Sequence, residues 1–287
     1  MDIIAQIGLN IVIAGAIYSL AALGFNLIYS TARFFDLGYG AYLIVGGYTV
    51  LYFHKMLGFG IIPAVILGMV AAGMVGFLVE KIVYRKLRTR KASSTVLLVA
   101  SLGVFTVAQG LFAILFSSQF QTLSRDIGSE RLFSFFGGII TQTQVLILLV
   151  ALSIMIVLAY TLKYTPFGKA VRAISDDEEV AQVVGINSEK LLGIVFFIGA
   201  AIGGLAGIAA GFDTGIQPMG MALLLSGVIA AIVGGVGNVY GGVLGAFMLA
   251  FAENIAAWHI GGEWKFAVAF GILIIFLIFR PQGIFPK

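Results

Sequence analysis

Long charge-free runs, separated by short charged stretches, organise this chain. The runs cover residues 3–32, 37–54, 56–79, 92–124, 132–162, 191–212, 214–252 and 266–279. A membrane-spanning helix needs about 20 apolar residues, so most runs can hold one span and 214–252 can hold two. Hydrocarbon offers the backbone no hydrogen-bond partners, so we expect these runs to be helices. The pattern predicts an all-α, polytopic transmembrane bundle that forms a single domain over residues 1–287.

These runs predict how many times the chain crosses the membrane. The pattern predicts nine spans, which include 3–30, 36–54, 60–80 and 263–279, with four of the nine between residues 190 and 280. The segments 36–54 and 221–257 are rich in glycine and short for the spans they must supply, so re-entrant or broken helices are an alternative there. We therefore expect eight to ten spans.

Basic residues predict the orientation, because cytoplasmic loops carry an excess of Lys and Arg. The stretch from Lys81 to Lys91 holds six basic residues and no acid. The stretch 163–190 holds Lys163, Lys169, Arg172 and Lys190, and the tail from Arg280 to Lys287 is basic. The stretch 118–140 balances acids and bases, as an external loop can. We expect the N-terminus outside the cell and the C-terminus in the cytoplasm.

Composition narrows the class of protein further. The chain is 60% hydrophobic and 10% charged, against about 25% charged for a soluble domain. Its net charge of +4 comes from cations beside helix ends, so we expect contact with membrane lipid and no nucleic acid. The chain has no cysteine, which excludes disulfides and thiolate metal sites. The two histidines stand far apart and predict neither a metal site nor a catalytic triad.

Small residues recur at four-residue spacing in three stretches, and this spacing places them on one helix face. Small side chains there let neighbouring backbones approach closely, although they could also line a path through the membrane. The three files are Gly199, Gly203, Gly207 and Gly211; Gly237, Gly241 and Gly245; and Ala64, Gly68, Ala72 and Gly76.

A short helix is predicted within the polar stretch 163–190. Ser175 followed by Glu178 has the form of a capping box, which predicts a helix start at about Asp176. Gly185 suits the left-handed residue that ends a helix. Three valines between them, Val180, Val183 and Val184, form an apolar stripe at helical spacing. This stripe either packs on the chain's own helix ends or docks into a partner protein.

Polar side chains inside apolar segments are costly and indicate function. We select Asn26, Asp36, Asn238 and Glu253 as candidates for a substrate path. Two alternatives stay open: Glu253 reaches water or pairs locally, and Asp36 pairs with nearby Arg33 at the cytoplasmic edge.

The chain has no site for ATP of its own. ATP hydrolysis uses a phosphate cradle of the form Gly-x-x-x-x-Gly-Lys-Ser/Thr. The only Gly-Lys pair, at Gly168 and Lys169, is followed by Ala170 and has no glycine at the required upstream position. We expect no catalytic residue, no bound cofactor and no enzyme activity; any ATP would be bound by partner subunits.

Several segments together resemble one family. The sequence Glu179-Val-Ala181-Gln-Val-Val-Gly185 is similar to the Glu-Ala-Ala-x-x-x-Gly loop by which permeases of ATP-binding cassette (ABC) importers dock into their ATPases. Four other segments resemble branched-chain amino acid ABC importer permeases of the LivH type, in the family's order along nearly the whole chain. They are Ala16–Tyr29, Phe167–Ala173 with Gly185-Ile-Asn187, Gly234–Gly245 and Phe279–Phe285.

The resemblance implies a multi-pass permease subunit in a bacterial or archaeal plasma membrane that works by alternating access. Its implied partners are two ABC ATPase subunits, a second related permease and a periplasmic or lipid-anchored solute-binding protein. The implied ATPase contact consists of Arg172, Glu179, Ala181 and Gly185. The alternative is a stand-alone secondary transporter or channel for a small solute.

The resemblance leaves the solute open. Where the family usually has Asn-Phe-Ala-His-Gly, this chain has Phe34-Phe-Asp36-Leu-Gly38. The candidates are leucine-type amino acids, urea and other small amides.

Overall fold

A computed structural model describes residues 3–123, 131–135, 137–218, 221–280 and 282–285. Arg125, Asp126 and Glu130 of the expected external loop lie outside the described residues, as do Pro281 and Lys287 of the basic tail. The elements are α1 (Ile3–Ala32), α2 (Tyr39–Val50), η1 (Leu51–Met56), α3 (Ile61–Val79), η2 (Glu80–Tyr84), α4 (Arg85–Thr89), α5 (Ser94–Phe116), β1 (Leu132–Phe135), β2 (Gly138–Thr141), α6 (Gln142–Tyr164), α7 (Pro166–Asp176), α8 (Glu178–Val183), α9 (Ser188–Asp213), α10 (Ala222–Gly234), α11 (Val239–Ile260), η3 (Gly262–Trp264) and α12 (Lys265–Phe279).

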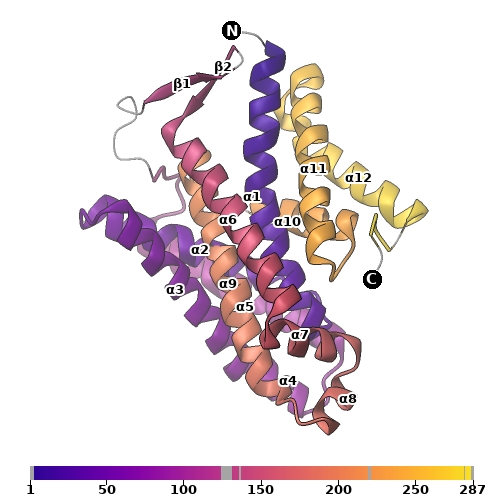
Figure 1. Ribbon diagram of the computed structural model, residues 1–287. Coiled ribbons are helices and arrows are strands. Elements are labelled where there is room, and N and C mark those ends of the chain that lie inside the picture. Colours follow the sequence, from indigo (N-terminus) through magenta and orange to yellow (C-terminus); the bar gives the residue numbers. More distant parts are fainter. Residues whose placement is uncertain (1–2, 124–130, 136, 219–220, 281, 286–287) are drawn as a thin grey trace.

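Helices dominate the described residues, as the apolar runs predict. Seven helical stretches there are long and apolar enough to cross a membrane. They are α1, α3 with its continuation through η2 and α4, α5, α6, α9, α11, and η3 with α12. The multi-pass, all-α class is confirmed. The antiparallel hairpin of β1 and β2, with Leu132 opposite Thr141, is a small addition outside the bundle (Figure 1).

The count of eight to ten spans is not confirmed, and the difference arises in the two segments noted for their glycines. α2 has 12 residues and α10 has 13. At 1.5 Å per residue α10 covers about 20 Å, less than the roughly 30 Å hydrocarbon core. α2 continues directly into η1, which carries His54 and Lys55, and this continuous helix is not among the seven. α10 stops at Gly234 because the next residue, Gly235, takes a φ of 120° and turns the chain into α11. Such a break is tolerated because the surrounding protein satisfies the freed backbone groups.

Two helices form the centre of the bundle. α1 and α9 are the most buried of the seven long helices. α9 packs on α1, α2 and α3 at backbone distance: a Cβ added at Gly207 would lie 2.1 Å from the Leu43 carbonyl oxygen, and one at Gly204 would lie 2.4 Å from Ala72 Cβ. Between α10 and α11, a Cβ at Gly241 would lie 2.3 Å from the Gly234 oxygen. Close packing, predicted from the three small-residue files, is confirmed.

The basic segments gather at one end of the bundle. α4, α7 and α8 lie at the end opposite the N-terminus, whereas the β-hairpin lies at the N-terminal end (Figure 1). An ion pair between Arg85 of α4 and Glu189 at the start of α9 joins the stretch 81–91 to the end of the stretch 163–190. The stretches 81–91 and 163–190 therefore lie at the same end of the bundle, as predicted.

Candidate functional site

The helix α7 is fixed to the end of α6. Thr165 caps α7 by accepting a hydrogen bond from the Gly168 N–H at 3.2 Å, and Pro166 stands at the first helical position. The Arg172 guanidinium donates to the carbonyl oxygen of Leu162 in the last turn of α6. A cation there also suits the negative end of the α6 dipole. Arg172 therefore holds α7 at a fixed angle to the bundle.

The predicted start of the short helix at Asp176 is wrong. α7 continues through Ser175 to Asp176 because Val171 and Ile174 are buried in the core and keep the helix in place. The chain then becomes extended at Asp177, whose side chain accepts from the Val180 N–H at 3.0 Å. Asp177, and not Ser175, is the N-cap, and α8 begins at Glu178.

The short helix α8 presents an uncovered apolar face. Val180, Val183 and Val184 are 59%, 87% and 71% exposed, whereas Ala181 is buried on the inner side. The predicted left-handed cap at Gly185 is confirmed: its φ is +90°, and the Ile186 N–H closes the turn on the Ala181 carbonyl at 3.0 Å. Glu179 is exposed beside the valines. Within this chain's described residues, the stripe does not pack on the chain's own helix ends.

A hydrogen bond joins this segment to the central helix. Arg33, directly after α1, donates to the Ser175 carbonyl near the end of α7. Arg33 adopts a φ of 58°, a left-handed conformation that non-glycine residues rarely take. The bond connects the α7–α8 segment to α1, which runs the full length of the bundle.

Asp36 is enclosed by tyrosines. Its side chain is 1% exposed, and it accepts hydrogen bonds from Tyr84 at 2.6 Å and Tyr42 at 3.3 Å. Its candidate partner Arg33 binds the Ser175 carbonyl, and the ion pairs among described residues are Arg85–Glu189 and Arg88–Glu80. The structure therefore contradicts the alternative in which Asp36 pairs with Arg33.

Asn26 and Asn238 meet at the turn between α10 and α11. The Asn26 side chain is fully buried; it accepts from the Gly237 N–H and donates to the Asn238 carbonyl, both at 3.0 Å. Asn238 caps α11 with its own side chain and donates to the Phe285 carbonyl of the tail at 3.3 Å. Both candidates lie together, and both are engaged in holding this turn.

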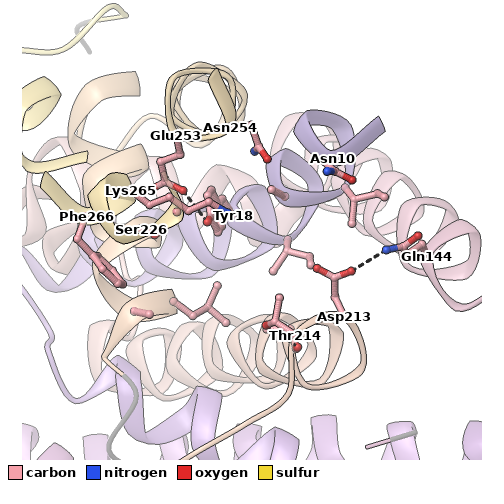
Figure 2. A pocket seen from close by; sticks show the side chains of 17 residues that line it. Asn10, Tyr18, Gln144, Asp213, Thr214, Ser226, Glu253, Asn254, Lys265 and Phe266 are labelled. Atoms are coloured by element: carbon pink, nitrogen blue, oxygen red, sulfur yellow. Dashed lines mark hydrogen bonds between the residues drawn. The ribbon is translucent and has the colours of Figure 1, made fainter. Parts of the chain in front are cut away.

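Glu253, the fourth candidate for the substrate path, lines an open cavity of about 390 Å³ (Figure 2). α1, α6, α9, α10, α11 and α12 all contribute to the lining. α6 contributes through Gln144 at its start and α9 through Asp213 at its end, and both of these helix ends lie away from α8. Glu253 is 2% exposed and accepts from the Tyr18 hydroxyl at 2.7 Å. On another wall Asp213 accepts from the Gln144 amide at 2.9 Å. We call this space the polar cavity.

The described residues offer no metal centre, since no group of three His, Cys, Asp or Glu side chains among them could hold an ion. The geometry consists instead of an uncovered helix at one end and a polar cavity at the other. A model of the family "branched-chain amino acid transport system / permease component" matches residues 7–277. The chain belongs to this family.

Individual members of the family resemble the chain along nearly its whole length. The high-affinity branched-chain amino acid transport system permease protein BraD of Pseudomonas aeruginosa is 28% identical over 95% of this chain and 92% of its own length. LivH of Escherichia coli, which bears the same description, is 28% identical over 97% of this chain and 94% of its own length. The resemblance inferred from the motifs is confirmed.

A solved structure supports the fold. The chain resembles a structure described as PsaBC from Streptococcus pneumoniae in complex with Fab, with a TM-score of 0.55 and 12% identity. The match covers 95% of this chain and 91% of the other. At this identity the likeness concerns the architecture alone.

Of the residues that line the polar cavity, only Glu253 was selected from the sequence, and Tyr18, Asp213 and Lys265 were not. Tyr18 lies inside the first-helix signature, yet its hydroxyl reaches Glu253 across 235 positions. Lys265 is the last charge before the final apolar run, and Asp213 is the single charge between two such runs. An isolated charge at the boundary of an apolar run could have indicated residues of this kind. It would not have shown which other residues they lie beside.

Proposed function

We propose that this chain is a permease subunit of an ABC importer that carries branched-chain amino acids by alternating access. The end that bears α4, α7 and α8 faces the cytoplasm in this proposal, which places the N-terminus outside. Two ATPase subunits, a second permease and a solute-binding protein complete the importer. Membership of the family supports the class, and the family's description supports the solute over urea or other amides.

The uncovered face of α8 carries the docking part of the proposal. An apolar stripe on a short helix, beside basic segments, is suited to a partner that removes it from water. Each of the four predicted contact residues has a distinct role there. Glu179 touches the ATPase directly, Ala181 supports α8 from its buried side, Gly185 ends the helix, and Arg172 fixes α7 to α6.

The substrate path in this proposal includes Asn26, Asp36, Asn238 and Glu253. Glu253 is in contact with the polar cavity, whereas Asn26 and Asp36 are buried and hydrogen-bonded in the present conformation. Alternating access would have to uncover these two residues in another state. A stand-alone secondary transporter is not favoured, because the relatives are permease components of transport systems.

The docking surface can be tested by Val183→Asp in the importer reconstituted with its partner subunits in proteoliposomes. Val183 is 87% exposed, so the variant folds normally. An unpaired carboxylate in an apolar contact costs at least about 2 kcal/mol, which corresponds to roughly 30-fold weaker ATPase binding. We expect ATP-driven leucine uptake to fall accordingly.

Two controls separate docking from folding. Val183→Thr keeps the shape and should retain most uptake, and Thr89→Asp adds the same charge at an exposed position on the same end of the bundle. Gly185→Val strains the left-handed cap and should uncouple ATP turnover from uptake without preventing membrane insertion. Wild-type uptake in both Val183→Asp and Gly185→Val would exclude α8 as the ATPase contact.

A further inference from the structure

We propose that the polar cavity is a binding subsite for a zwitterionic α-amino acid with an aliphatic side chain. In this assignment the Glu253 carboxylate receives the ammonium group and the Lys265 ammonium receives the carboxylate. The inference rests on the proposed function and adds to it the residues that hold the solute's charged head.

Glu253 is prepared to receive a positive group. It is nearly completely buried, and the Tyr18 hydroxyl orients one of its carboxylate oxygens, Oε2, at 2.7 Å. Among the described residues it forms no ion pair, since those pairs involve Arg85, Arg88 and their partners. The charge of Lys265 acts on this carboxylate within the same cavity, but the two groups form no ion pair. Glu253 therefore has an opposite charge nearby and no charged group in direct contact, although buried carboxylates are usually paired. An incoming ammonium group would supply that contact.

Lys265 supplies the opposite charge in the same space. It begins α12, and its side chain lines the polar cavity close to Glu253 (Figure 2). No ion pair within the described part of the chain engages it either. A cation at a helix N-terminus is disfavoured by the helix dipole, so the stability of α12 does not explain this lysine. A carboxylate bound beside it would be favoured by both the lysine and the dipole.

The remaining walls set the class of solute. Asp213 accepts from Gln144 on the other side of the cavity, whereas Glu253 lies beside Lys265 (Figure 2). Glu253 and Lys265 are therefore the neighbouring acid and base that one ligand can reach. Ile13, Ile17, Leu223 and Phe266 provide apolar surface between them, which suits an aliphatic side chain. The volume of about 390 Å³ lies in the range of roughly 300–1,000 Å³ for small-molecule sites. A simple amine would leave Lys265 without its counter-charge.

The location of the polar cavity also supports its assignment as a binding subsite. The lining includes Gln144 at the start of α6 and Asp213 at the end of α9. These helix ends lie on the side of the bundle away from α8 (Figure 1), where a solute released by an external binding protein would enter. Tyr18 also belongs to α1, the helix whose end is bonded to α7 through Arg33 and Ser175. A movement of α7–α8 would therefore reach the helix that orients Glu253.

The natural absence of cysteine allows a direct test by thiol labelling. Ala14→Cys places a single thiol on the cavity wall, one helical turn from Tyr18. The complete importer, purified with its partner subunits, is labelled with a small hydrophilic methanethiosulfonate in the presence of L-leucine, 3-methylbutylamine or 4-methylpentanoate. The amine lacks the carboxylate of leucine, and the acid lacks its ammonium group.

We expect leucine to slow labelling, and each analogue to need a concentration at least about tenfold higher, as the loss of one charge-assisted contact implies. Glu253→Gln, which keeps the shape and an acceptor for Tyr18, should raise the half-protecting leucine concentration by a similar factor. Lys265→Gln should do the same. Glu263→Gln, an exposed acid nearby that does not line the cavity, should change nothing, and Ser118→Cys should label equally with or without leucine.

Three results would overturn the assignment: no protection at leucine concentrations that saturate uptake, protection unchanged in both charge variants, or equal protection by the amine and leucine. ATP-driven leucine uptake is measured in the same preparation of the Ala14→Cys importer. Uptake without protection would remove only the cavity assignment. Absence of leucine uptake in the wild-type importer would remove the proposed function itself.

Discussion

Asn26 offers the sharpest test of how the broken helix is held. Asn26→Leu replaces the buried amide with an apolar group of similar size and leaves the Gly237 N–H and the Asn238 carbonyl without their partner. Each buried backbone group left unsatisfied costs about 1–3 kcal/mol. We expect a loss of about 3 kcal/mol in the free energy of unfolding.

The assay is thermal unfolding of the purified chain in detergent, followed by helical circular dichroism. A loss of about 3 kcal/mol corresponds to a fall in Tm of roughly 6–12 °C for a chain of this size class. Asn10→Leu is the matched control: Asn10 stands on the same helix, but it is exposed. Surface substitutions of this kind change stability by about 0.5 kcal/mol or less.

The same variant separates two roles for Asn26. If its main role is to contact the moving solute, Asn26→Leu will keep the wild-type Tm and change the KM for leucine. If its main role is to hold the α10–α11 turn, the Tm will fall. An unchanged Tm with an altered KM would refute our reasoning about the turn and favour the substrate-path assignment.

Three further substitutions test other parts of the structure. Gly207→Val should abolish stable folding in detergent, measured by size-exclusion chromatography, because its Cβ would lie 2.1 Å from a carbonyl of α2. Tyr84→Phe removes the 2.6 Å hydrogen bond to the Asp36 carboxylate and should cost about 1.5–3 kcal/mol, measured by thermal unfolding. Arg33→Gln weakens the link to Ser175 and should lower leucine uptake per ATP hydrolysed while membrane insertion persists.

Each of these has a control. Gly103→Val adds the same side chain where no atom lies within 4 Å, and it should leave the elution profile intact; an intact Gly207→Val profile would contradict the close approach of α9 and α2. Tyr160→Phe removes an exposed hydroxyl, and a Tyr84→Phe protein as stable as this control would contradict the role of Tyr84. Normal coupling in Arg33→Gln would exclude the α1–α7 bond as part of the transmission.

The sequence by itself determined the class of the molecule. Length and hydrophobicity of a segment decide whether it enters a membrane, and both are local properties. The basic residues near helix ends and the left-handed preference of Gly185 are local too. The placement of the stretches 81–91 and 163–190 at one end of the bundle, and the end of α8, could therefore be predicted. The four-residue spacing of glycines predicted close packing, although it did not say that Gly207 meets α2 or that Gly241 meets Gly234.

Only the tertiary structure decided where the polar groups go. Ser175 and Asp177 are both good N-caps in sequence, and burial of Val171 and Ile174 selected Asp177. Asn26 reaches Asn238 across 212 positions, and Tyr18 reaches Glu253 across 235. Such partners depend on which faces of α1 and α11 meet. The spacing of residues within one helix shows which side chains share a face. It does not show which other helix packs against that face.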